Sequence, residues 1–293
     1  MNTLRNAIAA GQFYPANETR LRQQIEQCFL DKRGYGVIPS VQKKQGPLKG
    51  LVVPHAGFIY SGAIASHAYG RLAEQGFGET FIIIGPNHTG MGSGVSVMTQ
   101  GSWETPFGQV PIDKDLAARL ATGIVDNDST AHIYEHSIEV QLPFLQFIGK
   151  NKDFSFIPLC MMMQDYDTAR EVGEILATVL QNSSKQVILI ASSDFSHVGF
   201  NYQSNPPEGI RVDEYAKQQD ALAIHDILSL NPRQLIQTVE EHSISMCGYG
   251  PVAAMLTAVK KLNAQKAELL KYGTSYEVHP DTSCVGYGAV MVT

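Results

Sequence analysis

Apolar and polar positions alternate along the chain in a way that separates short buried strands from longer helices. The segment TFIIIGP at 80–86 is a continuous apolar run rich in β-branched residues, which is typical of a strand buried on both faces of a sheet. Comparable segments predict further strands at 50–54, 94–99, 154–161, 186–194, 268–276 and 283–292. Apolar residues between them predict helices at 17–30, 61–75, 113–122, 136–148, 167–181, 211–229, 231–241 and 248–262.

This order of elements predicts the fold class. Strands that alternate with helices favour an α/β protein, in which helices cover the faces of a mostly parallel or mixed sheet. The chain has 293 residues, and α/β folds of this length often form one unit. We therefore expect a single-domain α/β sandwich over residues 1–293, with a central mostly parallel or mixed β-sheet flanked by helices.

Composition and charge exclude several classes of partner. The chain is 44% hydrophobic and 17% charged, and its net charge is −6 at pH 7. We expect no nucleic-acid partner, because nucleic-acid binding usually shows as a basic patch. No apolar run approaches the ~20 residues of a membrane-spanning helix, and the N-terminus lacks a secretory signal pattern. We therefore expect no membrane contact. Four scattered cysteines without a CxxC pair predict reduced thiols and a cytoplasmic location.

Histidines follow three of the predicted strands. His55 comes directly after the strand at 50–54, and His88 follows the strand at 80–86. Asp194 and His197 lie at the end of the strand that starts at residue 186. In open α/β sheets, ligands bind beyond the carboxyl ends of the strands. We therefore expect these side chains to meet in one cleft.

Histidine is the most frequent metal ligand in proteins and a general base near neutral pH. Two histidines and one anionic ligand with open positions are typical of non-haem iron, and zinc and copper also suit imidazole and thiolate. The residues alone leave the anionic partner open between Asp194, Glu139 and a cysteine thiolate. The thiolate candidate is Cys247, which precedes two glycines, a proline and an apolar helix, where its pKa could be lowered.

Further candidates surround the predicted cleft. His136 and Glu139 stand at the start of an apolar helix, and we place them at the rim of the cleft. Phe13, Tyr14 and Phe58 are candidate aromatic walls for a substrate. We count His136 with His197 and Asp194 as the candidate catalytic residues. The chain has no P-loop, no dinucleotide fingerprint and no GxSxG elbow, which argues against nucleotide binding and an α/β-hydrolase.

With these residues assembled, the chain resembles the Memo family over nearly its whole length. The matching segments, in the order of the family, are AGQFYP (10–15), PHAGFIYSG (54–62), GPNHTG (85–90), EHSIEVQLPF (135–144), SSDFSHVG (192–199) and CGYGP (247–251). The resemblance implies a fold similar to the class III extradiol dioxygenases, which are non-haem iron enzymes. It also implies a radical-SAM protein as a partner.

The resemblance also implies a set of metal ligands. They match His55, His88 and Cys247, with Asp194 and His197 beside them. The dioxygenases have a carboxylate as the third ligand, whereas this chain keeps a cysteine. Because a thiolate shifts metal preference toward copper and other soft ions, dioxygenase activity does not carry over automatically.

Two hypotheses about function follow. In the first, the chain is an oxidoreductase that holds Fe(II) or copper, with zinc as a further candidate, at His55, His88 and Cys247. His197, oriented by Asp194, moves protons for a small-molecule substrate. In the second, the same cleft binds a phosphopeptide or another anionic ligand without catalysis.

Overall fold

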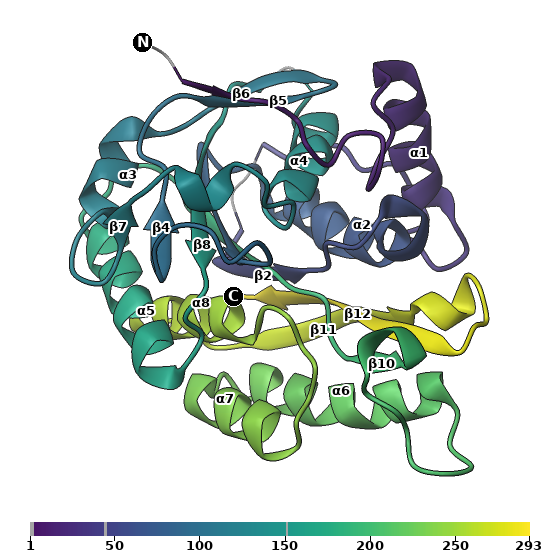
Figure 1. The fold of residues 1–293 in the computed structure, drawn as a ribbon. Coiled ribbons are helices and arrows are strands. Elements are labelled where there is room, and N and C mark those ends of the chain that lie inside the picture. The colour runs from purple at the N-terminus through teal and green to yellow at the C-terminus, as the bar shows by residue number, and fades with distance from the viewer. Residues whose placement is uncertain (1–2, 44–45, 151) are drawn as a thin grey trace.

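Four parallel strands form the centre of the main β-sheet (Figure 1). The computed structural model describes residues 3–43, 46–150 and 152–293. The central strands lie side by side in the order β2 (Gly50–Val53), β9 (Val187–Ser192), β3 (Thr80–Pro86) and β8 (Ser155–Met161). They are almost entirely buried, which explains why their sequences are continuous apolar runs. Because they are parallel, their carboxyl ends meet at one edge of the sheet.

Antiparallel strands extend the sheet on both sides. On one side, β12 pairs with β2 and carries two further strands, so that this edge consists of β12 (Ser283–Val292), β11 (Ala267–Thr274) and β10 (His197–Gly199). On the other side, β8 pairs with β4 (Val95–Val97), which pairs in turn with β7 (Asp126–Asn127). The predicted α/β fold with a mixed, mostly parallel central sheet flanked by helices is confirmed.

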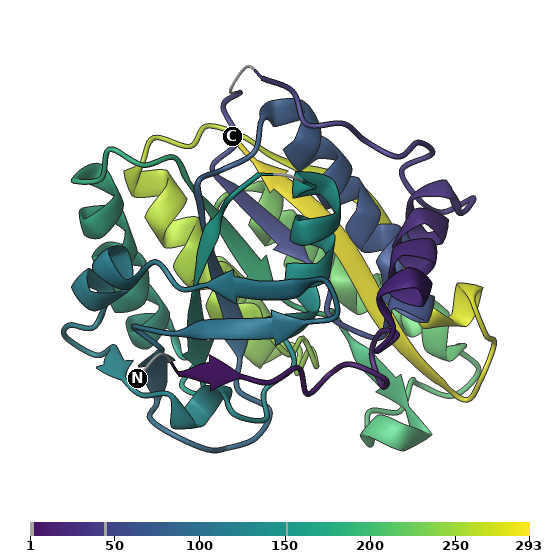
Figure 2. The same cartoon turned by 90° about the horizontal axis from the view of Figure 1, so that it is seen from above.

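Helices cover both faces of this sheet (Figures 1 and 2). One layer consists of α1 (Glu18–Leu30), α2 (Phe58–Gln75) and α4 (Leu142–Gly149). The other contains α5 (Tyr166–Gln181), α6 (Val212–Leu228), α7 (Pro232–Glu241) and α8 (Tyr249–Lys261), with α3 (Lys114–Leu120) packed against α5. Within the described part of the chain, no helix combines the length and the apolar character that crossing a membrane requires.

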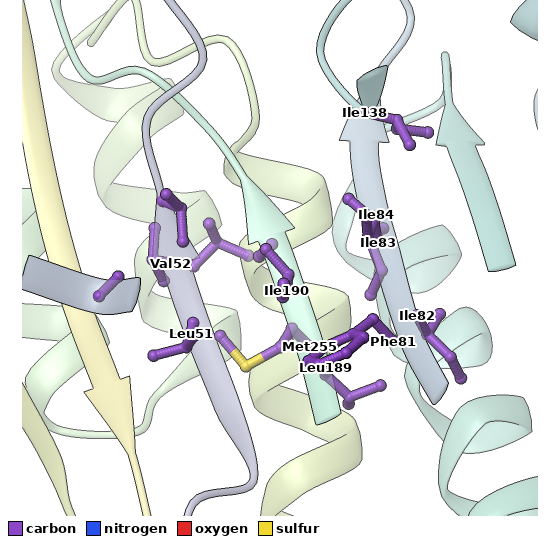
Figure 3. Packing of buried hydrophobic residues seen from close by; sticks show 14 of the residues in the cluster. Leu51, Val52, Phe81, Ile82, Ile83, Ile84, Ile138, Leu189, Ile190 and Met255 are labelled. Atoms are coloured by element: carbon purple, nitrogen blue, oxygen red, sulfur yellow. The ribbon is translucent and has the colours of Figure 1, made fainter. Parts of the chain in front are cut away.

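The hydrophobic core lies on both faces of the central strands (Figure 3). Ile83 of β3, Ile190 of β9 and Leu51 of β2 are fully buried on one face, and Met255 of α8 is fully buried on the other face, where it packs against Gly50. Burial of each such side chain contributes about 1.5–3 kcal/mol. The core therefore fixes the central strands, and with them the positions of the loops at their carboxyl ends.

The segment predicted as one helix over 136–148 divides into two elements. A 3₁₀ turn at Glu139–Gln141 leads into α4, which begins only at Leu142. Pro143 lies in the first turn of α4, where its missing N–H leaves no hydrogen bond unmade. The prediction was wrong about the helix start, so His136 lies in the preceding loop.

A small three-stranded sheet was not predicted. It joins β1 (Leu4–Arg5) to the hairpin of β5 (Ser102–Thr105) and β6 (Gly108–Pro111), and Figure 2 shows the N-terminal strand beside this hairpin. These strands of two to four residues are too short to show a periodic pattern. The remaining short elements are 3₁₀ turns at Thr130–His132, Phe200–Tyr202 and Ser275–Glu277.

Candidate metal centre

Three neighbouring parallel strands deliver polar side chains to one edge of the sheet. His55 follows the end of β2 by two residues, and His88 follows the end of β3 by two. Asp194 follows β9, which lies between β2 and β3. Because the three strands are in register, the loops after them lie side by side.

Two imidazoles and a thiol converge at this edge. The Nε2 atom of His55 lies 3.2 Å from the Sγ atom of Cys247. The ligand atoms of His55, His88 and Cys247 all lie within 4.8 Å of one another, so the three side chains could hold one metal ion. Two nitrogens and a sulfur form a donor set that suits copper, zinc and iron, so the residues fit a transition metal.

Cys247 reaches this point because the chain before α8 packs closely against the end of β9. A Cβ atom at Gly248 would lie 2.7 Å from the carbonyl oxygen of Ser192 and 2.8 Å from the Oγ atom of Ser193, closer than real Cβ atoms come. The N–H of Gly248 donates to Ser193 Oγ at 3.0 Å. Glycine at 248 therefore allows the approach that positions the sulfur.

Glu135 is the hydrogen-bond partner that orients His88. Its fully buried carboxylate accepts hydrogen bonds from the backbone N–H of His88 at 2.6 Å, from His88 Nδ1 at 3.0 Å and from the N–H of Ser137 at 2.8 Å. His88, Glu135 and His136 form a second group whose ligand atoms lie within 4.8 Å of one another. Since three N–H donors already occupy the carboxylate, we interpret Glu135 as a hydrogen-bond partner of a metal-binding histidine.

Stacked rings form one wall beside this centre. The ring of His136 stacks on His88 with centroids 4.7 Å apart and on Phe13 with centroids 4.2 Å apart. Phe13 comes from the N-terminal segment, which is fixed by its neighbour Tyr14, whose hydroxyl donates to buried Glu139. Glu139 also pairs with Arg5 and accepts hydrogen bonds from the N–H groups of residues 8 and 9.

Asp194 and His197 have separate hydrogen-bond partners. Asp194 Oδ1 accepts hydrogen bonds from the backbone N–H groups of His55 at 2.8 Å and of Ala56 at 3.3 Å. His197 Nδ1 lies 3.0 Å from the carbonyl oxygen of Ser245, whose hydroxyl also accepts a bond from the N–H of His197 at 2.8 Å. Asp194 therefore fixes the loop after β2, and Ser245 orients His197.

Burial and neighbouring charges shift the pKa values of the site in opposite directions. Burial, together with the nearby histidines, holds the pKa of His55 well below its usual range. Burial also lowers the pKa of His136, to about 4. Burial acts in the same sense on His88, but the hydrogen bond and charge of Glu135 outweigh it and raise the pKa of His88. His55 and His136 are thus neutral near pH 7, as metal binding requires of a ligand.

His55 and His88 of this centre line a cavity of about 420 Å³. Its walls include His197 and the rings of Phe13, Tyr60 and Tyr202. Among the described residues that line the cavity, none is Lys or Arg. A larger cavity of about 610 Å³ lies near α1 and the β5–β6 hairpin, but it contains none of the predicted site residues.

Comparisons with known proteins show to which family the chain belongs. The family model described as "Memo-like protein" matches residues 5–291. The chain belongs to the Memo family. It is 46% identical to a MEMO1 family protein of Methanococcus maripaludis, covering 98% of this chain and 99% of the relative. It is 44% identical to a MEMO1 family protein of Methanocaldococcus jannaschii over the full length of both chains.

A solved structure shows a related fold. The crystal structure of an uncharacterized protein from Escherichia coli K12 superposes with a TM-score of 0.58 and 14% sequence identity, covering 84% of this Memo-family chain and 100% of that chain. At this identity the likeness concerns the fold alone.

The structure brings most of the predicted site residues together. His55, His88 and Cys247 form one group, and His136, Asp194, His197 and Phe13 line the same cavity. Two details of the prediction were wrong. Asp194 makes no hydrogen bond to His197 among the described contacts; its Oδ1 accepts from the N–H groups of His55 and Ala56, and the carbonyl of Ser245 orients His197 instead. The pKa of Cys247 is raised well above its ordinary value, not lowered, because burial and the charge of Asp194 outweigh the hydrogen bonds with the Asp194 backbone and the Ser193 side chain.

Three predicted substrate-binding residues lie behind the cavity wall. Glu139 is fully buried and bonded to Arg5 and Tyr14. Tyr14 is 3% exposed, and Phe58 packs against Tyr14 with ring centroids 5.4 Å apart. None of the three belongs to the described lining of the cavity, because the helical positions that carry Phe58 and Glu139 face the core. They position Phe13 and do not reach the cavity themselves.

Sequence reasoning missed Glu135, Tyr60 and Tyr202. Glu135 lies next to His136 in the motif EHSIEV, and this adjacency was the available signal. Tyr60 of α2 and Tyr202 line the mouth of the cavity and are 41% and 42% exposed. Nothing in the local pattern distinguishes them from ordinary surface tyrosines.

Proposed function

We propose that this Memo-family protein is a metal-dependent redox protein that holds iron or copper at His55, His88 and Cys247. The observation that carries the proposal is the meeting of two imidazoles and a thiol beside a cavity that His55 and His88 line and that is large enough for a small organic molecule. A bound iron or copper ion would supply one-electron chemistry and Lewis acidity next to that cavity.

The protein residues around the ion supply binding and proton transfer. The imidazole of His197 lines the cavity, and its Nδ1 faces the carbonyl oxygen of Ser245. Since a carbonyl only accepts hydrogen bonds, Nδ1 carries the hydrogen and Nε2 is left with a lone pair. His197 can therefore accept a proton at Nε2 from a molecule in the cavity, which is the role of a general base.

The walls favour a planar organic ligand. Phe13, Tyr60 and Tyr202 offer ring faces and edges around the cavity, and Tyr202 packs edge-on against His197 with centroids 5.0 Å apart. Rings of this kind stack on aromatic molecules. A dioxygenase-like reaction on a small aromatic substrate is therefore the form of the proposal that this cavity supports best.

The alternative of a phosphopeptide site finds less support. Phosphate recognition usually relies on clustered Arg side chains, and the described lining of the cavity has neither Arg nor Lys. Anionic-ligand binding and a radical-SAM partner stay predictions that rest on the resemblance.

Metal content tests the proposal directly. The protein, purified without chelator, is expected to contain iron or copper near one ion per chain, measured by mass spectrometry of the elements. His88→Ala is expected to lose that ion, whereas His242→Ala, at the exposed end of α7, is the matched control and should keep it. Failure of the wild type to bind more iron, copper or zinc than His88→Ala, in oxidised or reduced form, would refute the proposal.

Turnover separates the two hypotheses. Under the redox proposal, oxygen consumption with a catechol-like probe is expected in the wild type and is lost in His197→Ala, which keeps the ion. Binding of a phosphotyrosine peptide that persists after metal removal would instead favour the alternative.

A further inference from the structure

The hydroxyl of Ser192 is the meeting point of a buried hydrogen-bond chain behind His55. Its Oγ atom lies 3.0 Å from His55 Nδ1, 2.6 Å from the carbonyl oxygen of Ser137 and 2.8 Å from the Nε2 atom of Gln141. All four residues are at most 2% exposed. Because water has little access to this chain, its partners must satisfy one another.

The direction of each hydrogen bond follows from the donors and acceptors present. The amide nitrogen of Gln141 also lies 3.1 Å from the carbonyl oxygen of Pro54, which can only accept, and Gln141 Oε1 lies 2.6 Å from the hydroxyl of Tyr69. This fixes the amide orientation, so Gln141 donates to Ser192. The carbonyl of Ser137 also only accepts, and it receives the single hydrogen of the Ser192 hydroxyl.

Ser192 can then only accept a hydrogen bond from His55. We propose that Tyr69, Gln141 and Ser192 are positioning residues that hold His55 in one tautomer, with hydrogen on Nδ1. The Nε2 atom, 3.2 Å from Cys247 Sγ, is left with its lone pair directed toward the metal centre. This inference rests on the proposed metal function, because it explains how the protein prepares one of the ligands.

The opposite tautomer leaves a buried group unsatisfied. With hydrogen on Nε2, His55 Nδ1 would need a donor, and Ser192 could supply one only by releasing the carbonyl of Ser137. Two of the other histidines that line the cavity follow the same rule with simpler partners. His88 Nδ1 faces the carboxylate of Glu135, and His197 Nδ1 faces the carbonyl of residue 245. All three imidazoles thus turn Nε2 toward the cavity.

Nitrogen NMR of the metal-free full-length chain tests the tautomer. Long-range proton–nitrogen spectra of protein labelled at histidine nitrogen, with the signals of residue 55 assigned by their loss in His55→Gln, distinguish Nδ1–H from Nε2–H directly. We expect Nδ1–H for His55 in the wild type. A wild-type spectrum showing Nε2–H, or both tautomers equally, overturns the inference without any variant.

Metal affinity tests the positioning role. Copper(I) competition with a chromophoric chelator is expected to show binding 10–100-fold weaker in Ser192→Ala than in the wild type. The matched control is Ser66→Ala, which removes a buried hydroxyl that donates to Ala63 in α2 and accepts from Tyr35, away from the cavity. It should leave both the affinity and the tautomer of His55 unchanged. Ser192→Thr, which keeps the hydroxyl, should restore affinity and the Nδ1–H spectrum.

The outcomes separate this inference from the proposed function. If the wild type binds neither copper(I) nor, in the element measurement above, iron, the metal proposal fails, and the nitrogen spectrum still decides the tautomer. If the wild type binds copper(I) and Ser192→Ala binds it equally well, the metal proposal survives and the positioning role of the hydrogen-bond chain is refuted.

Discussion

Asp220 of α6 carries a buried carboxyl group that should dominate one part of the pH dependence of folding stability. The side chain is fully buried; Oδ1 accepts from the N–H of Ser196 at 2.8 Å and Oδ2 from the hydroxyl of Tyr272 at 2.6 Å. Burial, only partly offset by these hydrogen bonds, raises the pKa of Asp220 from the ordinary 3.8 to about 6. The folded chain therefore binds this proton more tightly than the unfolded chain does.

The sign and size of the effect follow from linkage. As the pH rises from about 4 to about 6, the unfolded chain loses this proton first, so the free energy of unfolding falls. A shift of about two pKa units corresponds to about 3 kcal/mol. Asp220→Asn is neutral at every pH and does not titrate. Its stability relative to the wild type is therefore expected to rise by up to about 3 kcal/mol between about pH 4 and about pH 7.

Urea denaturation of both chains across this pH range measures the difference. Asp165→Asn is a control for which the stability difference from the wild type should change with pH in the opposite direction. Asp165 caps α5 by accepting from the side chain and the N–H of Thr168, and these hydrogen bonds lower its pKa. The wild type should therefore gain stability over Asp165→Asn as the pH rises through the acid range. A pH-independent difference between Asp220→Asn and the wild type would show that the carboxyl of Asp220 titrates normally.

Three further predictions concern the metal centre and the core. Cys247→Ser should weaken copper binding more than iron binding, since copper(I) favours sulfur ligands; equal losses in competition titrations would argue against a thiolate bond. Arg5→Met should lower the free energy of unfolding by about 3–5 kcal/mol, because it leaves the charge of Glu139 buried and unpaired. Adding Glu139→Gln should recover part of that loss in the double variant, and additive losses in urea denaturation would contradict this. Ile83→Ala should lower the free energy of unfolding by about 2–5 kcal/mol, whereas Ile133→Ala, at a side chain that is 42% exposed, should lower it by under about 0.5 kcal/mol. Similar shifts in melting temperature for both variants would contradict the packing in Figure 3.

The sequence predicted that His55 and His88 meet, because their positions depend on strand ends. A continuous apolar run marks a buried parallel strand, and the residue after it must lie at the carboxyl edge of the sheet, so His55 and His88 could be placed together. Cys247 could be assigned to this site only through the family resemblance, because the sequence pattern of a helix start does not specify which strand end the helix start faces.

The supporting residues could not be predicted in the same way. The contacts of Ser192 and Gln141 join segments 51 residues apart, and the partner of Glu139 lies 134 residues away at Arg5. Local patterns assign such residues to a strand end or a helix start, but they do not specify which polar atom each will meet. The helix predicted at 136–148 was placed too early, although the sequence held a local signal of its true start. Pro143 suits the first turn of a helix better than a helix interior.

The long separation between the donor side chains sets when the ion can be acquired. His55 and Cys247 lie 192 residues apart, and β2, which positions His55, pairs with the C-terminal strand β12. A growing chain on the ribosome has its imidazoles early but lacks the sulfur until residue 247 has been added, and it lacks β12, the neighbour of β2, until residues 283–292 have followed. Under the proposed function, the site can therefore bind its ion only after β12 has been made and has paired with β2.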